Sequence, residues 1–177
     1  MENGNVYVTD TFNNRVLELA AGRSAPTTLP FGTPNNPSLI AVENGNVYIS
    51  DLDRRQVFKL AAGTATLTTL PFRADAMIGG IAVHNGDLFV TDESNSYTPE
   101  FGSFGPTPPG GTVRKIPGGT ESSTVVPFRG FQGLAGIAVN GGKVYITDQK
   151  NKRVLALPVD TPAAGLNTGS IGVPFGS

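Results

Sequence analysis

Apolar and polar residues alternate along this chain in short runs, and one such run occurs four times. It reads Val-Tyr-Val-Thr-Asp at 6–10 and returns with small changes at 47–51, 88–92 and 144–148. Alternation with a period of two, carried by β-branched and aromatic residues, predicts a β-strand. No segment shows an apolar period of 3.6 residues over helical length, so we predict no substantial helix.

The run ends each time in an aspartate, and these residues are Asp10, Asp51, Asp92 and Asp148. Their separations are 51 − 10 = 41, 92 − 51 = 41 and 148 − 92 = 56 residues. A fixed period near 40 indicates stacked supersecondary units. Each repeat reads as four strands, A to D, and in the second repeat we expect them at 39–42, 47–51, 56–60 and 69–72.

Turn residues support this division. Strands A and B are joined by Asn44-Gly45, by Asn85-Gly86 and by Asn140-Gly141, and Asn-Gly between apolar runs is the strongest short hairpin signal. Every expected D strand contains a proline, as in the Leu-Pro-Phe segment at 29–31. Proline has no N–H to donate, which predicts that strand D lies at the edge of its sheet.

Units of about 41 residues with four antiparallel strands are typical of β-propeller blades. The blades resemble the NHL-repeat propeller family over nearly the whole chain. The resemblance lies in the Val-Tyr-Val-Thr-Asp strand, the Asn-Asn-Arg-Val segment at 13–16 and the Gly-Ile-Ala-Val strand with its Asn-Gly turn. The three places that name the family hold Asn14-Arg15-Val16 here, with counterparts at 55–57 and 152–154.

The segment Asn-Asn-Arg-Val-Leu-Glu-Leu-Ala-Ala-Gly, followed by Leu-Pro-Phe, is most similar to the extracellular sensor propeller of actinobacterial Ser/Thr protein kinases. That resemblance implies an extracytoplasmic or cell-surface location, which the sequence by itself leaves open. It also implies a sensor role within a larger kinase. Propellers of the family serve as sensors, scaffolds, RNA binders and lyases, so the fold alone does not select a function.

We therefore expect one all-β domain over residues 1–177, with a partial blade at 6–31 and full blades at 39–72, 80–128 and 136–175. Family propellers close with about six blades, so we expect an open arc or a fragment of a longer propeller, with a four-bladed ring as the alternative. An arc exposes apolar blade faces and an unpaired strand edge. Self-association through these open blade edges is one expected consequence.

Composition narrows the classes of function. The chain carries 13 basic and 14 acidic side chains, a net charge of −1, which gives no general attraction to nucleic acid. Cysteine is absent, which excludes disulfides and thiolate metal sites. No apolar run approaches the roughly 20 residues that span a bilayer, so we expect no membrane insertion by this chain.

The repeated aspartates are interpreted as structural residues and not as metal ligands. An aspartate at a strand end accepts nearby backbone N–H groups and can pair with a basic residue, as Asp10 with Arg15. His84 is the only histidine, whereas zinc enzymes of this fold need several imidazoles around an open metal position. Ser103 lacks the glycine two residues before it that a nucleophile elbow uses. We expect no catalytic constellation, no metal and no cofactor.

The strongest functional lead is an insertion in the third B–C loop. Asp92 and Val113 are 21 residues apart where Asp10 and Val16 are 6 apart, so the loop is 15 residues longer. Its aromatic residues lie among serine, glycine and proline, a composition that suits recognition surfaces. An insertion that merely packs against its own blade is the alternative.

Because successive strands alternate in direction, the B–C loops share one side of the blades with the D–A connections, and we call it the B–C/D–A face. The candidate ligand-binding residues on this face are Tyr97, Phe101, Phe104, Arg54, Arg55, Arg73 and Arg129.

The predicted function is non-catalytic binding of a protein, peptide or small molecule on the B–C/D–A face, as in a sensor or scaffold. The alternative from another class is a lactonase- or lyase-type propeller enzyme that uses Asp, Asn and Glu ligands to a divalent cation. A third alternative is RNA binding, which the acidic residues among the basic ones disfavour.

Overall fold

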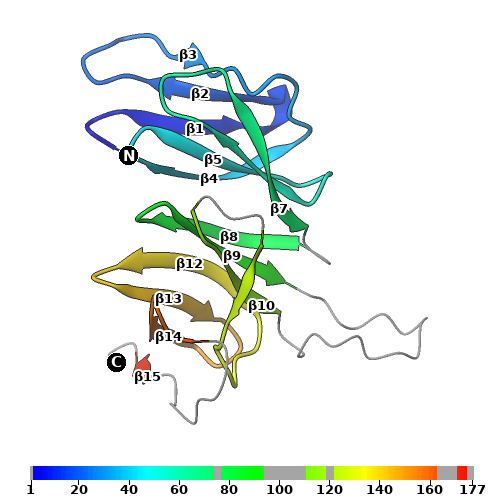
Figure 1. Ribbon diagram of the computed structural model, residues 1–177, viewed down its shortest axis with the longest axis vertical. Coiled ribbons are helices and arrows are strands. Elements are labelled where there is room, and N and C mark those ends of the chain that lie inside the picture. The colour runs from blue at the N-terminus through cyan, green and yellow to red at the C-terminus, as the bar shows by residue number, and fades with distance from the viewer. Residues whose placement is uncertain (1, 74–76, 94–110, 119–121, 163–170, 175–177) are drawn as a thin grey trace, which may run out of the picture. The chain divides into compact units, whose positions relative to one another are not determined.

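The computed structural model describes residues 2–73, 77–93, 111–118, 122–162 and 171–174, with only the backbone described at 71–73, 93 and 171–174. These residues fall into two compact units, Met1–Arg73 and Ala74–Ser177. Each unit contains two antiparallel sheets (Figure 1). We number the four sheets blades 1 to 4 in chain order.

The first unit contains blades 1 and 2. Blade 1 has three strands in the order β1 (Val6–Asp10), β2 (Arg15–Leu19) and β3 (Thr27–Thr28). Blade 2 has four in the order β4 (Pro37–Glu43), β5 (Asn46–Asp51), β6 (Gln56–Leu60) and β7 (Leu67–Arg73). Every strand pairs with the next one along the chain, so both sheets are simple meanders.

The second unit repeats this arrangement. Blade 3 consists of β8 (Met77–His84), β9 (Asp87–Glu93), β10 (Thr112–Ile116) and β11 (Thr124–Val126). Blade 4 consists of β12 (Leu134–Asn140), β13 (Lys143–Asp148), β14 (Arg153–Pro158) and β15 (Ile171–Pro174). The predicted all-β class and A-to-D strand order are confirmed. Within the described ranges the only helical element is a 3-10 turn at Thr11–Asn13.

Strand D is an edge strand in all four sheets, as the prolines predicted. The extent of two D strands differs from the prediction. The strands expected at 28–31 and 125–128 end at Thr28 and Val126, before Pro30 and Pro127. A proline cannot continue the ladder of N–H donors, and here the pairing stops short of it.

The A–B turns use left-handed backbone conformations. Asn44 and Gly45 have φ of 51° and 74°. Asn3 and Gly4 adopt a similar turn, with φ of 50° and 80°. Glu2 and Asn5 form a β-bridge around this first turn. Blade 1 therefore retains the turn that precedes strand B.

The turn expected at Asn140-Gly141 is wrong by one residue. Asn140 still pairs with Lys143, and the turn consists of Gly141 and Gly142, with φ of 54° and 70°. Glycine has no Cβ, so two glycines occupy both positive-φ positions without strain. The Gly-Gly pair therefore displaces the turn from asparagine.

The core of each unit lies between its two blades. In the first unit Val16 and Phe31 of blade 1 pack with Val47, Ile49 and Leu60 of blade 2. In the second unit the equivalent cluster joins blade 3 to blade 4 and includes Phe89, Val113, Phe128, Phe131, Val144, Ile146 and Leu155. The face that each blade turns toward the other blade of its unit is therefore apolar.

A hydroxyl in strand B adds a polar link between blades. Thr9 Oγ1 donates to the carbonyl of Ser38 at 2.6 Å, and Thr91 Oγ1 donates to the carbonyl of Ala135 at 3.1 Å. Both carbonyls belong to the first strand of the following blade. The threonine before the repeated aspartate thus fastens one blade to the next, a role that the sequence pattern did not indicate.

Candidate functional site

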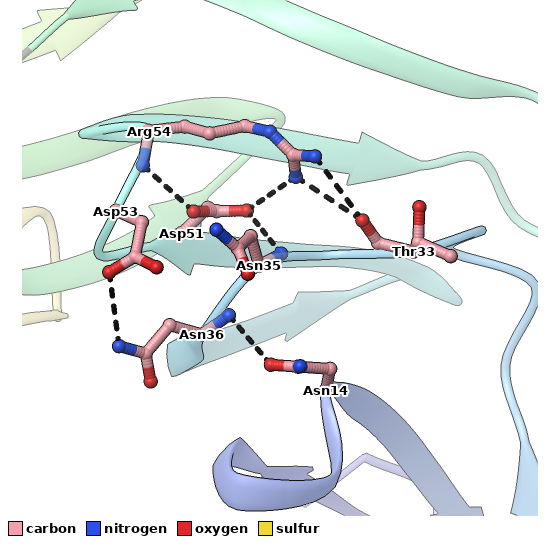
Figure 2. Close-up of polar contacts among 7 residues, drawn as sticks. All are labelled: Asn14, Thr33, Asn35, Asn36, Asp51, Asp53 and Arg54. Carbon is pink, nitrogen blue, oxygen red and sulfur yellow. Dashed lines mark hydrogen bonds and ion pairs between the residues drawn. The ribbon is translucent and has the colours of Figure 1, made fainter.

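The B–C/D–A face is organised around the aspartate that ends each B strand. In blade 2 the Asp51 side chain is fully buried. Its Oδ2 accepts the backbone N–H of Asn35 at 2.8 Å, and its Oδ1 accepts the backbone N–H of Arg54 at 2.9 Å (Figure 2). Asn35 lies in the D–A connection and Arg54 in the B–C loop, so one carboxylate joins the two segments.

Asp148 makes the same connection in blade 4. It is also fully buried, and its Oδ1 accepts the backbone N–H of Gln132 at 2.8 Å. Asn151 donates to both carboxylate oxygens, and Arg153 Nε donates to Oδ2 at 2.8 Å. The D–A donor precedes its aspartate by the same interval in both blades, since 51 − 35 and 148 − 132 are both 16.

These bonds determine the charge state of Asp148. Burial by itself would raise the pKa of the Asp148 carboxyl. The N–H of Gln132 and the side chains of Asn151 and Arg153 outweigh burial and hold this pKa below its ordinary value. Asp148 is therefore a carboxylate at neutral pH, with every bond directed toward blade 4 itself.

Asp10 is held more loosely. Its side chain is 23% exposed, and it pairs with Arg15 at 2.7 Å and with the Asn13 amide. Arg15 and then Asn13 lower the pKa of Asp10. Asp92 is fully buried at the end of β9, and the residue sixteen before it lies outside the described residues.

Blade 2 differs from blades 1 and 4 in where its arginine stands. In blades 1 and 4 the arginine that pairs with the aspartate follows it by five residues, as Arg15 follows Asp10. In blade 2 the arginine follows by three, as Arg54, and Gln56 occupies the fifth place. The guanidinium of blade 2 is therefore carried by the B–C loop, whereas those of blades 1 and 4 are carried by strand C.

The D–A connection of blade 2 is fixed at a second residue. Asn36, with φ of 69°, is hydrogen-bonded to two loops. Its backbone N–H donates to Asn14 Oδ1 at 2.9 Å, and its side-chain amide donates to Asp53 at 3.2 Å (Figure 2). Asn14 belongs to the B–C loop of blade 1 and Asp53 to that of blade 2. The three loops therefore form one connected surface.

A pocket of about 380 Å³ opens beside this surface. Phe31 and Pro34 of the D–A connection, with Phe58 of strand β6, supply apolar walls. Arg54 and Gln56 supply polar groups. The other residues around it are Gly32, Thr33, Ile49 and Leu67.

The Arg54 guanidinium is held in one orientation at this pocket. Its Nη1 donates to Asp51 Oδ2 at 2.8 Å, and Nη1 and Nη2 lie 3.3 and 3.4 Å from the carbonyl of Thr33 (Figure 2). Its central carbon lies 5.9 Å from the centroid of the Phe58 ring, within range of a cation–π interaction. The side chain is nevertheless 42% exposed. A guanidinium has five N–H donors, so this arrangement can still bind an acceptor.

The other candidates stand as follows. Tyr97, Phe101 and Phe104 lie outside the described residues. Arg55 is exposed in the B–C loop with φ of 54°, and Arg129 is exposed after β11.

Arg73 ends β7, where its backbone pairs with Gln56, and its side chain is outside the described part. Of the candidate residues that the structure describes, Arg54 lines the pocket. The sequence reading missed Phe31 and Phe58 as pocket residues, although the repeated Leu-Pro-Phe segment marked the place of Phe31.

The described ranges hold no cluster of three or more His, Cys, Asp or Glu side chains placed to bind a metal ion. They also hold no helix long and apolar enough to cross a membrane.

The sequence matches no protein-family model and no curated protein. Solved structures do match. A catalytically inactive virginiamycin B lyase from Staphylococcus aureus, in complex with quinupristin, aligns with a TM-score of 0.62 at 14% identity, over 98% of this chain and 53% of that chain. The selenomethionine-substituted enzyme aligns with a TM-score of 0.64 at 15% identity over the same shares. A nidogen/laminin complex aligns with a TM-score of 0.48 at 17% identity, over 89% of this chain and 73% of that chain.

The chain thus spans about half the length of the lyase chains that it matches. At 14–15% identity the likeness shows the fold alone. Together with the four antiparallel sheets of three or four strands, the two lyase matches establish that the chain is built from β-propeller blades.

Proposed function

We propose that this chain is a non-catalytic binding module that holds a peptide segment of a partner protein at the blade 2 pocket. The observation that supports this is the Arg54 guanidinium, oriented by Asp51 and the Thr33 carbonyl at the edge of an apolar pocket of about 380 Å³. Because Arg54 is already ordered, a ligand does not lose binding energy in ordering it.

The lining of the pocket defines the ligand class. Phe31, Phe58 and Pro34 suit an apolar side chain. The Arg54 guanidinium and the Gln56 amide can donate to a carbonyl or carboxylate beside that side chain. A peptide offers both groups side by side at each of its apolar residues. The Asp51–Arg54 ion pair has no net charge and so gives no general attraction to a polyanion. The proposed ligand is therefore a peptide with an apolar anchor.

We expect Arg54→Gln to weaken peptide binding at least tenfold. A hydrogen bond to a charged group contributes about 1.5–3 kcal/mol, and about 1.4 kcal/mol corresponds to a factor of ten in Kd. Peptides would be selected on the immobilised chain from a random phage-displayed library, and their Kd measured by fluorescence anisotropy. The matched control is Arg15→Gln, which removes the equivalent arginine of blade 1, 48% exposed and paired with Asp10, away from the pocket. Equal loss in both variants, or no loss in either, contradicts the proposal.

We also propose that the insertion in the third B–C loop contacts a partner protein, independently of the blade 2 pocket. Its residues Tyr97, Phe101 and Phe104 would be aromatic anchors. Deleting residues 94–109 would then reduce capture of a partner by the immobilised chain. Unchanged capture shows that this loop is not a binding contact. The resemblance to kinase sensor propellers makes an extracytoplasmic ligand-sensing role part of the same proposal.

A propeller enzyme is the second candidate, favoured only by the fold shared with virginiamycin B lyase. A thermal-shift series with Mg²⁺, Mn²⁺, Ca²⁺ and Zn²⁺ separates it from a binding module. A ligand that binds the folded state raises the Tm with its concentration. A strong saturable shift with one cation favours the enzyme, and RNA retention that falls steeply with salt favours RNA binding.

A further inference from the structure

We propose that blade 4 of a second copy of this chain packs on the exposed face of blade 1, through the same kind of contact that joins the two blades inside each unit. The inference rests on a comparison of equivalent positions in the repeat. It does not depend on the proposed peptide site.

Blade 1 has an apolar face that its own unit does not cover. Val6 and Val8 of β1 lie opposite Leu19 and Leu17 of β2 in the register, so the four side chains share one face of the sheet. Val8 is 49% exposed, and the other three are half-buried. An exposed cluster of branched apolar residues on one face of a sheet is a binding surface or an aggregation hazard.

The same positions are covered in blades 2 and 4. Val8 corresponds to Ile49 in β5 and to Ile146 in β13, which are 0% and 1% exposed. Val6 corresponds to Val47 and Val144, which are 3% and 0% exposed. These residues are covered by the preceding blade of their own unit. The repeat therefore shows what kind of surface fits the face of blade 1.

That covering surface shares two positions in both units. In the first unit it includes Tyr7 of strand B and Val16 of strand C, with Phe31 after strand D. In the second unit it includes Phe89 and Val113 at the same two positions, with Phe128 after strand D. Val16 and Val113 are 0% and 1% exposed once the following blade is in place. An aromatic residue and a valine thus meet the branched pair of the next blade each time.

Among the described residues of its own unit, no further blade packs on this surface of blade 4. Tyr145 stands at the place of Tyr7 and Phe89, on the face of β13 opposite Val144 and Ile146. Val154 stands at the place of Val16 and Val113 and pairs with Thr147 across the ladder. Both side chains are only partly buried. Blade 4 thus offers the surface that blade 1 lacks.

The occupant is a second copy because the two surfaces differ and are complementary. Such a head-to-tail contact either closes into a ring or continues into a filament. Inside each unit a surface of the blade 4 kind already covers a face of the blade 1 kind, so a second copy supplies the complementary surface. A closed dimer with two identical contacts satisfies both surfaces of both copies.

Sedimentation velocity and light scattering of the 177-residue chain over a wide concentration range test the proposal. A monomer has a mass of 18.4 kDa, and the expected dimer has 2 × 18.4 = 36.8 kDa. We expect Val8→Lys to return the mass to 18.4 kDa, since it places a charge in the contact. Val125→Lys is the matched control, because Val125 is 41% exposed on the edge strand β11 and outside the proposed contact.

A mixing experiment tests the head-to-tail geometry. Val8→Lys blocks only the face of blade 1, and Val154→Lys blocks only the face of blade 4. Each variant alone should be monomeric, and an equimolar mixture should form a heterodimer with one intact contact. Circular dichroism checks that both variants remain folded. A wild-type monomer at every concentration, equal disruption by Val125→Lys, or a mixture that stays monomeric overturns the proposal.

Discussion

Replacing Asp148 with alanine is expected to lower the free energy of unfolding by about 3 kcal/mol at neutral pH, because it removes a buried acceptor. Asp148 is fully buried and accepts hydrogen bonds from Gln132, Asn151 and Arg153. The Gln132 N–H would be left without its carboxylate, while Arg153, 36% exposed, can turn to water. Urea unfolding followed by circular dichroism measures the change.

The matched control is Asp10→Ala, which removes the equivalent carboxylate of blade 1. Asp10 is 23% exposed and its two partners are exposed side chains, so we expect little change. Equal destabilisation by the two substitutions contradicts the role given to the D–A contact, since Asp148 makes that contact and Asp10 does not.

The same substitution is expected to change how stability depends on pH. The pKa of Asp148 is lowered in the folded state. Its contribution is therefore complete above the ordinary pKa of 3.8 and is lost as the pH falls through the lower folded value. The difference in unfolding free energy between wild type and Asp148→Ala should shrink below that pH. A difference that stays constant down to acid unfolding would show that ionisation of Asp148 is irrelevant.

Gly80→Ala is expected to destabilise the second unit by about 1–3 kcal/mol, the usual effect of overpacking. A Cβ at residue 80 would lie 2.9 Å from Ile137 Cγ2 and 3.0 Å from the carbonyl oxygen of Ala135. The nearest of these is a side-chain methyl, but the second is backbone of β12, which cannot move without disturbing blade 4.

Gly136→Ala at the same position of the repeat is the control. Its Cβ would lie 3.5 Å from Thr147 Oγ1, an ordinary contact. Alanine also reduces the entropy of the unfolded chain, which stabilises by about 0.4–1 kcal/mol where the backbone is compatible. We expect the Tm of Gly136→Ala to equal or exceed that of the wild type and the Tm of Gly80→Ala to fall. Similar Tm values for the two variants contradict the inter-blade spacing.

Strand positions and their order could be predicted from the sequence because both are local or periodic properties. The alternation in Val6–Asp10 and its return after 41, 41 and 56 residues predicted strands and a meander, and β-branched residues with a repeated turn determine both. Errors occurred where two local signals competed. Because a second glycine follows Gly141, the turn forms at Gly141-Gly142, and Asn140 stays in its strand.

The contacts of the candidate site were less predictable because they join distant segments. The Asp10–Arg15 pair is visible from spacing, but the N–H of Asn35 reaches Asp51 from sixteen residues away and carries no side-chain signal. Similarly, Phe31 and Phe58 belong to different blades and meet only in the folded unit. The placement of arginine at position 54 instead of 56 is visible in the sequence as a departure from the repeat. Functional sites are expected at such departures.

In blades 2 and 4 a buried aspartate fastens the D–A connection to the B–C loop and so shapes the B–C/D–A face. Amide hydrogen exchange followed by NMR tests it most directly. Asn35 and Gln132 are exposed residues outside strands, yet their N–H groups donate to Asp51 and Asp148. We expect these two amides to exchange as slowly as strand amides of the same blade. Exchange at the rate of an unstructured peptide at both residues would contradict it.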